Sequence, residues 1–181
     1  MTFAFSLDRK QFSYAATFLF VLLALTPFQL SATEPAHRTK LLVLDIELVG
    51  DLGDASLAST HEERIRNVSN LLRQELSALP AYEIVDATPA NERIRSIRAV
   101  QYLHKCNGCE IDLALELGAD QVLVAWVHRV SQLILSVTYE IREAPSGRPI
   151  KRKAFDFRGD NDTSWSRAVT YMVKDLAQSQ K

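Results

Sequence analysis

Apolar and polar side chains alternate between residues 40 and 48, which is the pattern of a β-strand with one face in a hydrophobic core. The apolar face is formed by Leu42, Leu44, Ile46 and Leu48. After a loop rich in glycine and aspartate, apolar residues recur at helical spacing until Pro80 closes the segment. The folded part of the chain is therefore expected to begin with a strand and then a long helix.

The same two periods predict the later elements. They are expected at residues 82–85 (strand), 88–103 (helix), 111–117 (helix), 121–130 (strand), 133–142 (strand), 150–158 (strand) and 165–176 (helix). The order β-α-β-α-α-β-β-β-α predicts an α+β fold with an α/β start. Its mixed sheet has about five strands, with the helices mainly on one face, because two strands show a polar second side.

The N-terminal segment differs from the rest of the chain. Arg9 and Lys10 precede an uncharged apolar run from Tyr14 to Leu25, and Leu30-Ser31-Ala32 offers a small residue to a signal peptidase. The run of about 12 residues is shorter than the roughly 20 that a membrane-spanning helix needs, which disfavours the alternative of an uncleaved anchor. We therefore expect a secretory signal over residues 1–32 and a single exported domain over 33–181, with no stable membrane anchor in the mature chain.

Charge and composition narrow the class of partner. The formal net charge of -1 gives no field that would favour nucleic acid, so no nucleic-acid partner is expected. Two cysteines are too few for a disulfide framework, so a hydrophobic core must hold the fold. No sequence signal for a cofactor is found, and none is expected.

Cys106 and Cys109 are the most reactive feature of the sequence. In an oxidising compartment such a pair is expected to form a disulfide that joins two helices. A catalytic dithiol normally lies at the start of a helix that directly follows a strand, and no strand precedes this pair. A structural disulfide is therefore the leading interpretation, and redox catalysis is the alternative. A metal site that adds His104 is a further alternative, although structural zinc requires a fourth ligand that the sequence does not supply nearby. No metal is expected.

Other polar motifs have simpler interpretations. The loop 49–54 lacks the glycine and lysine spacing of a phosphate-binding loop. Asp156, Asp160 and Asp162 do not match a calcium-binding loop, and residues 160–163 are expected to cap the last helix. No catalytic residues are therefore assigned.

Two surfaces are candidates for contact with a partner. The basic run Lys151, Arg152 and Lys153 is interpreted as a protected sheet edge, or as a contact with anionic lipid or envelope polymer. The polar side of the sheet is the leading candidate for a partner face. Its residues are Asp45, Glu47, Ser136, Thr138, Glu140 and Arg142.

Segment 106–131 and the motif 158–165, which reads Arg-Gly-Asp-Asn-Asp-Thr-Ser-Trp, together resemble an exported bacterial family of unknown function. That family is similar to the amino-terminal domain of TolB and to the curli-secretion lipoproteins. The resemblance implies a periplasmic α/β domain that serves as an accessory or assembly module of the envelope, with an envelope protein as partner. The anchoring cysteine of the lipoproteins has no counterpart here. The leading hypothesis is thus a non-enzymatic binding module, with a thiol oxidoreductase or a metal-binding protein as alternatives.

Overall fold

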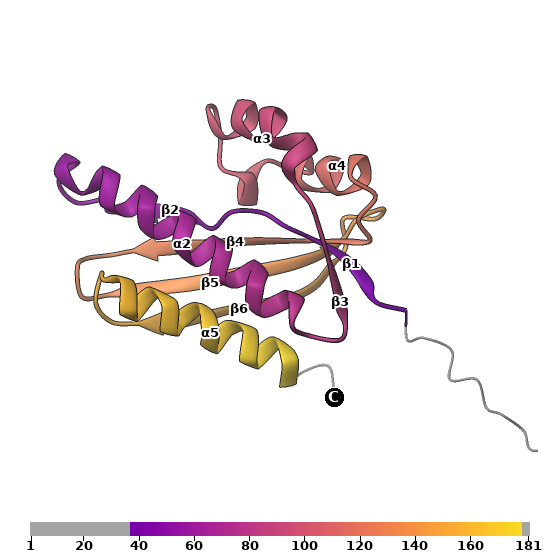
Figure 1. Ribbon diagram of the computed structural model, residues 1–181. Helices are drawn as coiled ribbons and strands as arrows, with labels where there is room; N and C mark the ends of the chain where they lie inside the picture. Colours follow the sequence, from indigo (N-terminus) through magenta and orange to yellow (C-terminus); the bar gives the residue numbers. More distant parts are fainter. Residues whose placement is uncertain (1–36, 179–181) are drawn as a thin grey trace, which may run out of the picture. The chain divides into compact units, whose positions relative to one another are not determined.

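A computed structural model describes residues 37–178 of the chain (Figure 1). The predicted secretory signal and its cleavage site lie outside the described residues. Within residues 37–178, no helix has both the length and the apolar character that are needed to cross a bilayer.

A mixed six-stranded sheet forms the centre of the domain. Its strands are β1 (Thr39–Val43), β2 (Glu47–Gly50), β3 (Tyr82–Val85), β4 (Gln121–Arg129), β5 (Leu135–Glu143) and β6 (Pro149–Phe157). They lie in the order β3-β1-β4-β5-β6, and β2 continues the line of β1 by pairing with β4. The pairs formed by β1 and β2 are parallel, whereas β4, β5 and β6 make an antiparallel meander.

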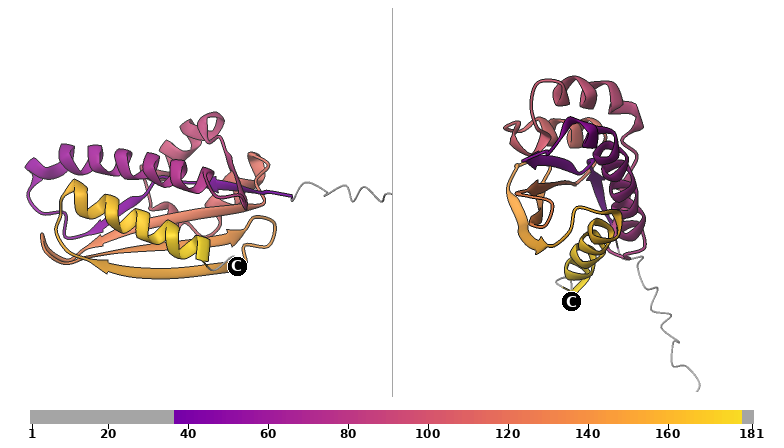
Figure 2. Two further views of the ribbon diagram at one scale, coloured as in Figure 1. Left: turned by 60° about the horizontal axis from the view of Figure 1, so that its bottom comes forward. Right: turned by 90° about the vertical axis from the view of Figure 1, so that its left-hand side faces the viewer.

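Helices cover both faces of this sheet unequally. The two long helices, α2 (Ala58–Ser77) and α5 (Asp162–Gln178), pack together over one face (Figure 2). The shorter α3 (Asn91–Arg98) and α4 (Cys109–Glu116) cover part of the second face, joined by the 3-10 turn η3 (Leu103–Lys105). The α+β class, the mixed sheet and the placement of the helices mainly on one face are confirmed.

The sheet separates two hydrophobic cores. Under α2 and α5, Trp165 and Leu72 pack against strand residues such as Tyr139 and Val127. On the second face, Leu113 and Ile94 pack against Leu42, Val122 and Val124. Strand β4 contributes to both cores, as its apolar sequence on both sides predicts.

The first predicted strand is one element in the sequence pattern but two in the structure. The ladder stops after Val43 and resumes at Glu47, so Leu42 and Leu44 face one core while Ile46 faces the other. The prediction that all four alternating residues share one face was therefore wrong. The interruption is stabilised locally, because Asp45 pairs with Arg73 and Arg98, and the Ile46 N–H donates to Ser69 Oγ at 2.9 Å.

The helix predicted over 88–103 is also shorter than expected. It ends at Arg98, and Val100, which was assigned to its buried stripe, is 82% exposed. Leu103 is buried, but in η3. The apolar residues keep helical spacing beyond the end of α3 because Leu103, which lies in η3, packs in the same core as Ile94.

Candidate functional site

A buried cluster of charged side chains is centred on Asp160, which lies just before α5. The Asp160 side chain is only 6% exposed. Its Oδ2 accepts from His61 Nε2 at 2.9 Å and from Arg129 Nε at 2.7 Å. Its Oδ1 accepts from Arg64 at 2.6 Å and from the indole N–H of Trp165 at 3.1 Å. One carboxylate thus joins α2, β4 and α5.

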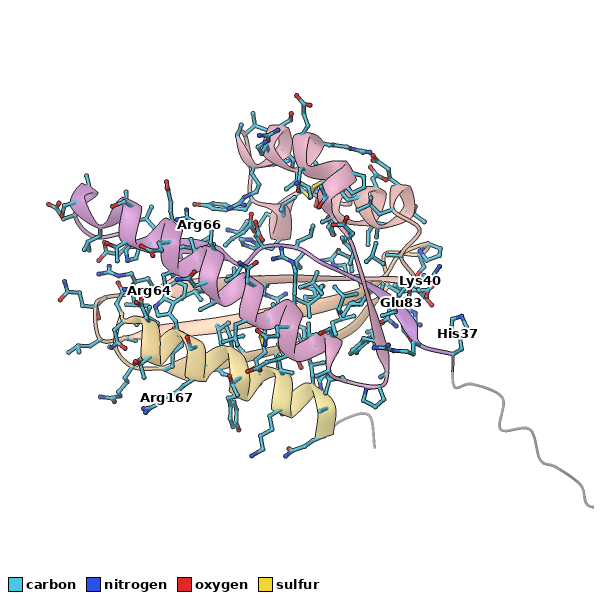
Figure 3. All side chains as sticks on the ribbon, in the orientation of Figure 1. His37, Lys40, Arg64, Arg66, Glu83 and Arg167 are labelled. Atoms are coloured by element: carbon cyan, nitrogen blue, oxygen red, sulfur yellow. A yellow bond between two sulfur atoms is a disulfide. The ribbon has the colours of Figure 1, made fainter. Side chains whose placement is uncertain are left out.

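The cluster also fixes the loops at this end of the domain. Arg129 donates to the carbonyl oxygen of Asp51 at 2.6 Å, in the loop that follows β2. The Asp160 N–H donates to the carbonyl oxygen of Gln132 at 2.8 Å, in the hairpin between β4 and β5. Arg64 projects from the side of α2 that faces α5, opposite to Arg66 (Figure 3). Three loops are therefore cross-linked by hydrogen bonds.

The surroundings of Asp160 lower its pKa. Burial acts to raise the pKa, but hydrogen bonds from His61 and Arg129 and the nearby charges of His61 and Arg64 outweigh it. The carboxylate is consequently held in its charged form. This role could not be predicted from the sequence, since the charged partners of Asp160 lie 31 to 99 residues away along the chain. The predicted cap of α5 is present at Asn161, whose Oδ1 accepts from the Ser164 N–H at 3.0 Å.

Exposed apolar side chains lie on the loops that this cluster holds. Leu133 is 69% exposed, Ile134 56%, Val130 54% and Leu52 49%. The loops that carry them are neighbours, because the Asp51 N–H donates to the carbonyl oxygen of Arg129 and the Val130 N–H donates to that of Ile134. We call these four residues the apolar tip. In Figure 1 these loops lie at the left-hand end, beside the start of α2.

The predicted partner face is less open than its polar pattern suggested. Glu47, Glu140 and Thr138 are buried, at 3%, 5% and 8% exposure, so the expectation of an exposed face was wrong at these three positions. The physical reason is that α4 and η3 lie over this part of the sheet. Asp45 and Arg142 keep side-chain exposures of 38% and 30%, and Ser136 is partly buried.

Glu47 supports η3. Its carboxylate accepts from the N–H groups of Leu103 and His104, at 2.8 and 3.1 Å, and contacts His104 Nδ1 at 2.6 Å. The His104 ring stacks on Trp126 with the ring centroids 4.4 Å apart. His104 is thus paired with a carboxylate and does not lie with the cysteines as a third metal ligand.

A second group of buried carboxylates lies under α4. Glu110 pairs with Arg142 at 3.2 Å, and Arg142 also donates to Glu140 at 2.8 Å. Within residues 37–178, no buried side-chain nitrogen or oxygen lacks a hydrogen-bond partner. Of the polar residues that the sequence placed on one face, Glu140 and Arg142 do lie together, and Arg142 also holds α4 through Glu110.

Cys106 and Cys109 form a disulfide, with their Cα atoms 5.6 Å apart. It joins the end of η3 to the first residue of α4, and the two residues between them, Asn107 and Gly108, have positive φ angles of 52° and 112°. The Glu110 carboxylate lies 3.1 Å from Cys106 Sγ. Cys106, Cys109 and Glu110 are also near enough to share an ion, but the disulfide occupies both sulfurs.

The basic run lies on the edge strand β6, where successive side chains point to opposite faces. Lys151 and Lys153 pair with Asp175 of α5, at 3.5 and 2.7 Å. Arg152 lies on the other face, over the Trp126 ring and 3.7 Å from Glu140. These three cations therefore have acidic or aromatic neighbours within the domain.

Comparison with known proteins places the chain in a family. The family described as "Protein of unknown function (DUF2380)" matches residues 39–176. The chain belongs to this family. The predicted membership of a family of unknown function is thereby confirmed. A search of curated proteins finds no match.

Several solved structures are similar to this domain. The C-terminal domain of LpoB from Salmonella enterica is 16% identical, with a TM-score of 0.45 over 65% of this chain and 81% of that one. The PelC dodecamer from Paraburkholderia phytofirmans is 15% identical, with a TM-score of 0.48 over 77% and 86%. TolB from Acinetobacter baumannii, the protein named by the sequence resemblance, is 9% identical, with a TM-score of 0.47 over 83% and 30%.

Proposed function

We propose that this domain is a non-enzymatic binding module of the bacterial envelope, which contacts a partner protein through the apolar tip. The observation that carries the proposal is that four exposed apolar side chains stand on loops fixed by the buried Asp160 cluster. Exposed apolar groups on rigidly held loops are typical of protein–protein contacts, because the partner buries them without an ordering cost.

Two features support an exported setting for this activity. The N-terminal pattern predicts a secretory signal, and the Cys106–Cys109 disulfide suits an oxidising compartment such as the periplasm. The exposed part of the sheet's second face, around Ser136 and Arg142, is a second surface that a partner could use.

Site-specific photo-crosslinking in the native host tests the proposal. A photoreactive residue at Leu133 is expected to give one discrete crosslinked protein, whereas the same residue at Lys174, exposed on α5 outside the tip, is not. The change Ile134→Ser should then abolish the crosslink at Leu133 while leaving the melting temperature nearly unchanged, because Ile134 is already exposed. Equal crosslinking at both positions, or its persistence in Ile134→Ser, would remove the tip as the binding surface.

A second candidate function is thiol–disulfide exchange, which the position of Glu110 favours. In such a reaction a substrate dithiol is oxidised to its disulfide while the Cys106–Cys109 bond is reduced to two thiols, and Glu110, 3.1 Å from Cys106 Sγ, can relay a proton. Burial of Cys106 limits access of a substrate. Oxidation of a reduced dithiol peptide by the purified protein, with two protein thiols appearing for each peptide disulfide formed, would support this candidate.

A further inference from the structure

Strand β2 has an edge that no other described strand covers. Strand β2 pairs with β4 on one side. On the other side β3 does not reach it, because β3 pairs with β1 and the β1–β3 register ends with Val85 opposite Leu42. The Asp51 N–H donates to Arg129, so by the alternation of a parallel ladder Glu47 and Val49 also turn their backbone groups toward β4. The N–H and C=O of Leu48 therefore point to the open side.

A pocket with a volume of about 350 Å³ lies along this open edge. Leu48 is one of its lining residues, together with Ala58, Glu62 and Ile65 of α2 and Tyr102 before η3. The N–H of Ile46, two residues before Leu48, is already bonded to the Ser69 hydroxyl of α2. This volume falls within the range of pockets that bind small ligands or a few side chains.

The charge around the pocket is unbalanced toward negative. The basic groups that line it are already paired, since Arg98 contacts Asp45 and His61 contacts Asp160. Glu62 and Asp54 also line it and are exposed, and no ion pair is found for either within the described residues. Hydrogen bonds from Ser56 lower the pKa of Asp54, which keeps its carboxylate charged.

We propose that the groove formed by the open edge of β2 and this pocket binds an extended segment of a partner protein, which adds a strand to that edge. The partner's main chain hydrogen-bonds to Leu48, its apolar side chains enter the pocket, and a lysine or arginine lies beside Glu62. This inference rests on the proposed function, because it specifies how a bound protein is gripped. Main-chain pairing supplies affinity in such complexes, and the pockets for alternate side chains supply specificity.

Peptide titration of the purified protein tests the inference. The probe is a fluorescent hexapeptide of alternating lysine and valine, compared with its glutamate–valine counterpart. We expect saturable binding of the lysine peptide, with a shift of the Leu48 amide resonance, and at least fivefold weaker binding of the glutamate peptide, as expected for loss of exposed charge pairs. Two further lysine peptides are N-methylated at alternate backbone nitrogens, one at the odd positions and one at the even positions. One of these two peptides should bind more weakly by a similar factor, because its methyl groups replace the N–H donors of the ladder.

Two neighbouring glutamates provide a matched pair of variants. Glu62 lines the groove and Glu63 does not, although both are exposed residues of α2. Glu62→Lys should raise the dissociation constant of the lysine peptide about fivefold, and Glu63→Lys should raise it less than twofold. The inference would be overturned by the absence of saturable binding, by an equal loss of affinity in both variants, or by unchanged binding of both N-methylated peptides. A concentration-dependent dimer that Glu62→Lys dissolves, without peptide binding, would assign the groove to a second copy of the chain. Crosslinking at Leu133 is read independently, so failure of the groove and failure of the proposed function are distinguishable.

Discussion

Asp160 shows how one side chain can organise a whole end of a small domain. Its carboxylate accepts hydrogen bonds from His61, Arg64, Arg129 and Trp165, which come from three separate elements. Buried ion pairs recover the cost of desolvation only when their geometry is good and all partners are satisfied. Removing the carboxylate would leave two buried guanidinium groups without a buried counter-charge. Its loss should therefore lower the free energy of unfolding far more than the loss of an exposed acid.

The change Asp160→Asn tests this role. It is expected to lower the free energy of unfolding by about 3–5 kcal/mol, because Arg64 and Arg129 would be left without a buried counter-charge. Asp162→Asn is the control, since Asp162 also contacts Arg64 but is 78% exposed, and it should cost less than about 1 kcal/mol. Urea unfolding measures both. Similar small losses in the two variants would show that the cluster contributes little to stability.

The same carboxylate predicts a dependence of stability on pH. The pKa of Asp160 is lowered in the folded state, so its contribution is complete above the unfolded pKa near 4 and is lost as the pH falls through the folded value. The difference in stability between the wild type and Asp160→Asn should therefore narrow below about pH 4. Urea unfolding at neutral pH and at several acidic values checks this. A difference that stays constant down to strong acid would contradict it.

At the scale of elements, the second face of the sheet is held together by buried carboxylates and one disulfide. Glu47 accepts the N–H groups of Leu103 and His104, and the disulfide joins η3 to α4 immediately afterwards. On an exposed partner face, as the sequence pattern predicted, Glu47 could be replaced without loss of stability. Its burial reverses that expectation.

Glu47→Gln should therefore destabilise the domain. The amide retains one acceptor oxygen but places a donor where Glu47 now accepts, so we expect a loss of about 1–3 kcal/mol. Glu83→Gln, at an exposed position of β3, is the control and should change stability by less than about 0.5 kcal/mol. Thermal and urea unfolding measure the difference. Equal stability of the two variants would show that Glu47 is not needed to hold η3.

The disulfide should contribute modestly. In the chain-entropy model the stabilisation rises with loop length, so a ring closed by residues three apart is expected to add about 1–2 kcal/mol. Replacing both Cys106 and Cys109 by alanine should lower the melting temperature slightly and leave crosslinking at Leu133 intact. Thiol counting on protein from the exported fraction gives the redox state directly. Free thiols there would remove the disulfide from the functional protein.

The elements that could be predicted from sequence are those whose pattern is local. Strand β4, apolar on both sides, and the stripe of α5 that includes Trp165 and Met172 follow directly from periodicity. The break at Asp45 could not be predicted, because Arg73 and Arg98 stabilise it from distant helices. The Asp160 cluster was missed for the same reason. Its nearest signal was the acidic motif before α5, which also fits a helix cap.

At the scale of the whole molecule, the two ends of the sheet differ in what they offer to a partner. The carboxyl end of β2 and β4 has the apolar tip, the Asp160 cluster and the groove beside Leu48. At the opposite end, the Lys40 N–H and carbonyl oxygen are both bonded to Asp120, and the Ala144 N–H is bonded to the Asp120 carbonyl oxygen. Binding is therefore expected at the first end, which has the apolar tip and the groove.

The predicted secretory signal would place such binding outside the cytoplasm. Arg9, Lys10 and the short apolar run before Pro27 predict cleavage after Ala32. Such a cut would leave β1 whole, because β1 begins at Thr39, beyond the expected start at Thr33. Mass spectrometry of the protein from an exporting host should therefore give a chain that starts near Thr33. Replacing Leu19 and Leu22 in the apolar run by arginine should retain the full-length precursor in the cytoplasm, because a charged run no longer resembles a signal. Recovery of the full-length wild-type chain from the membrane fraction would instead indicate an uncleaved anchor.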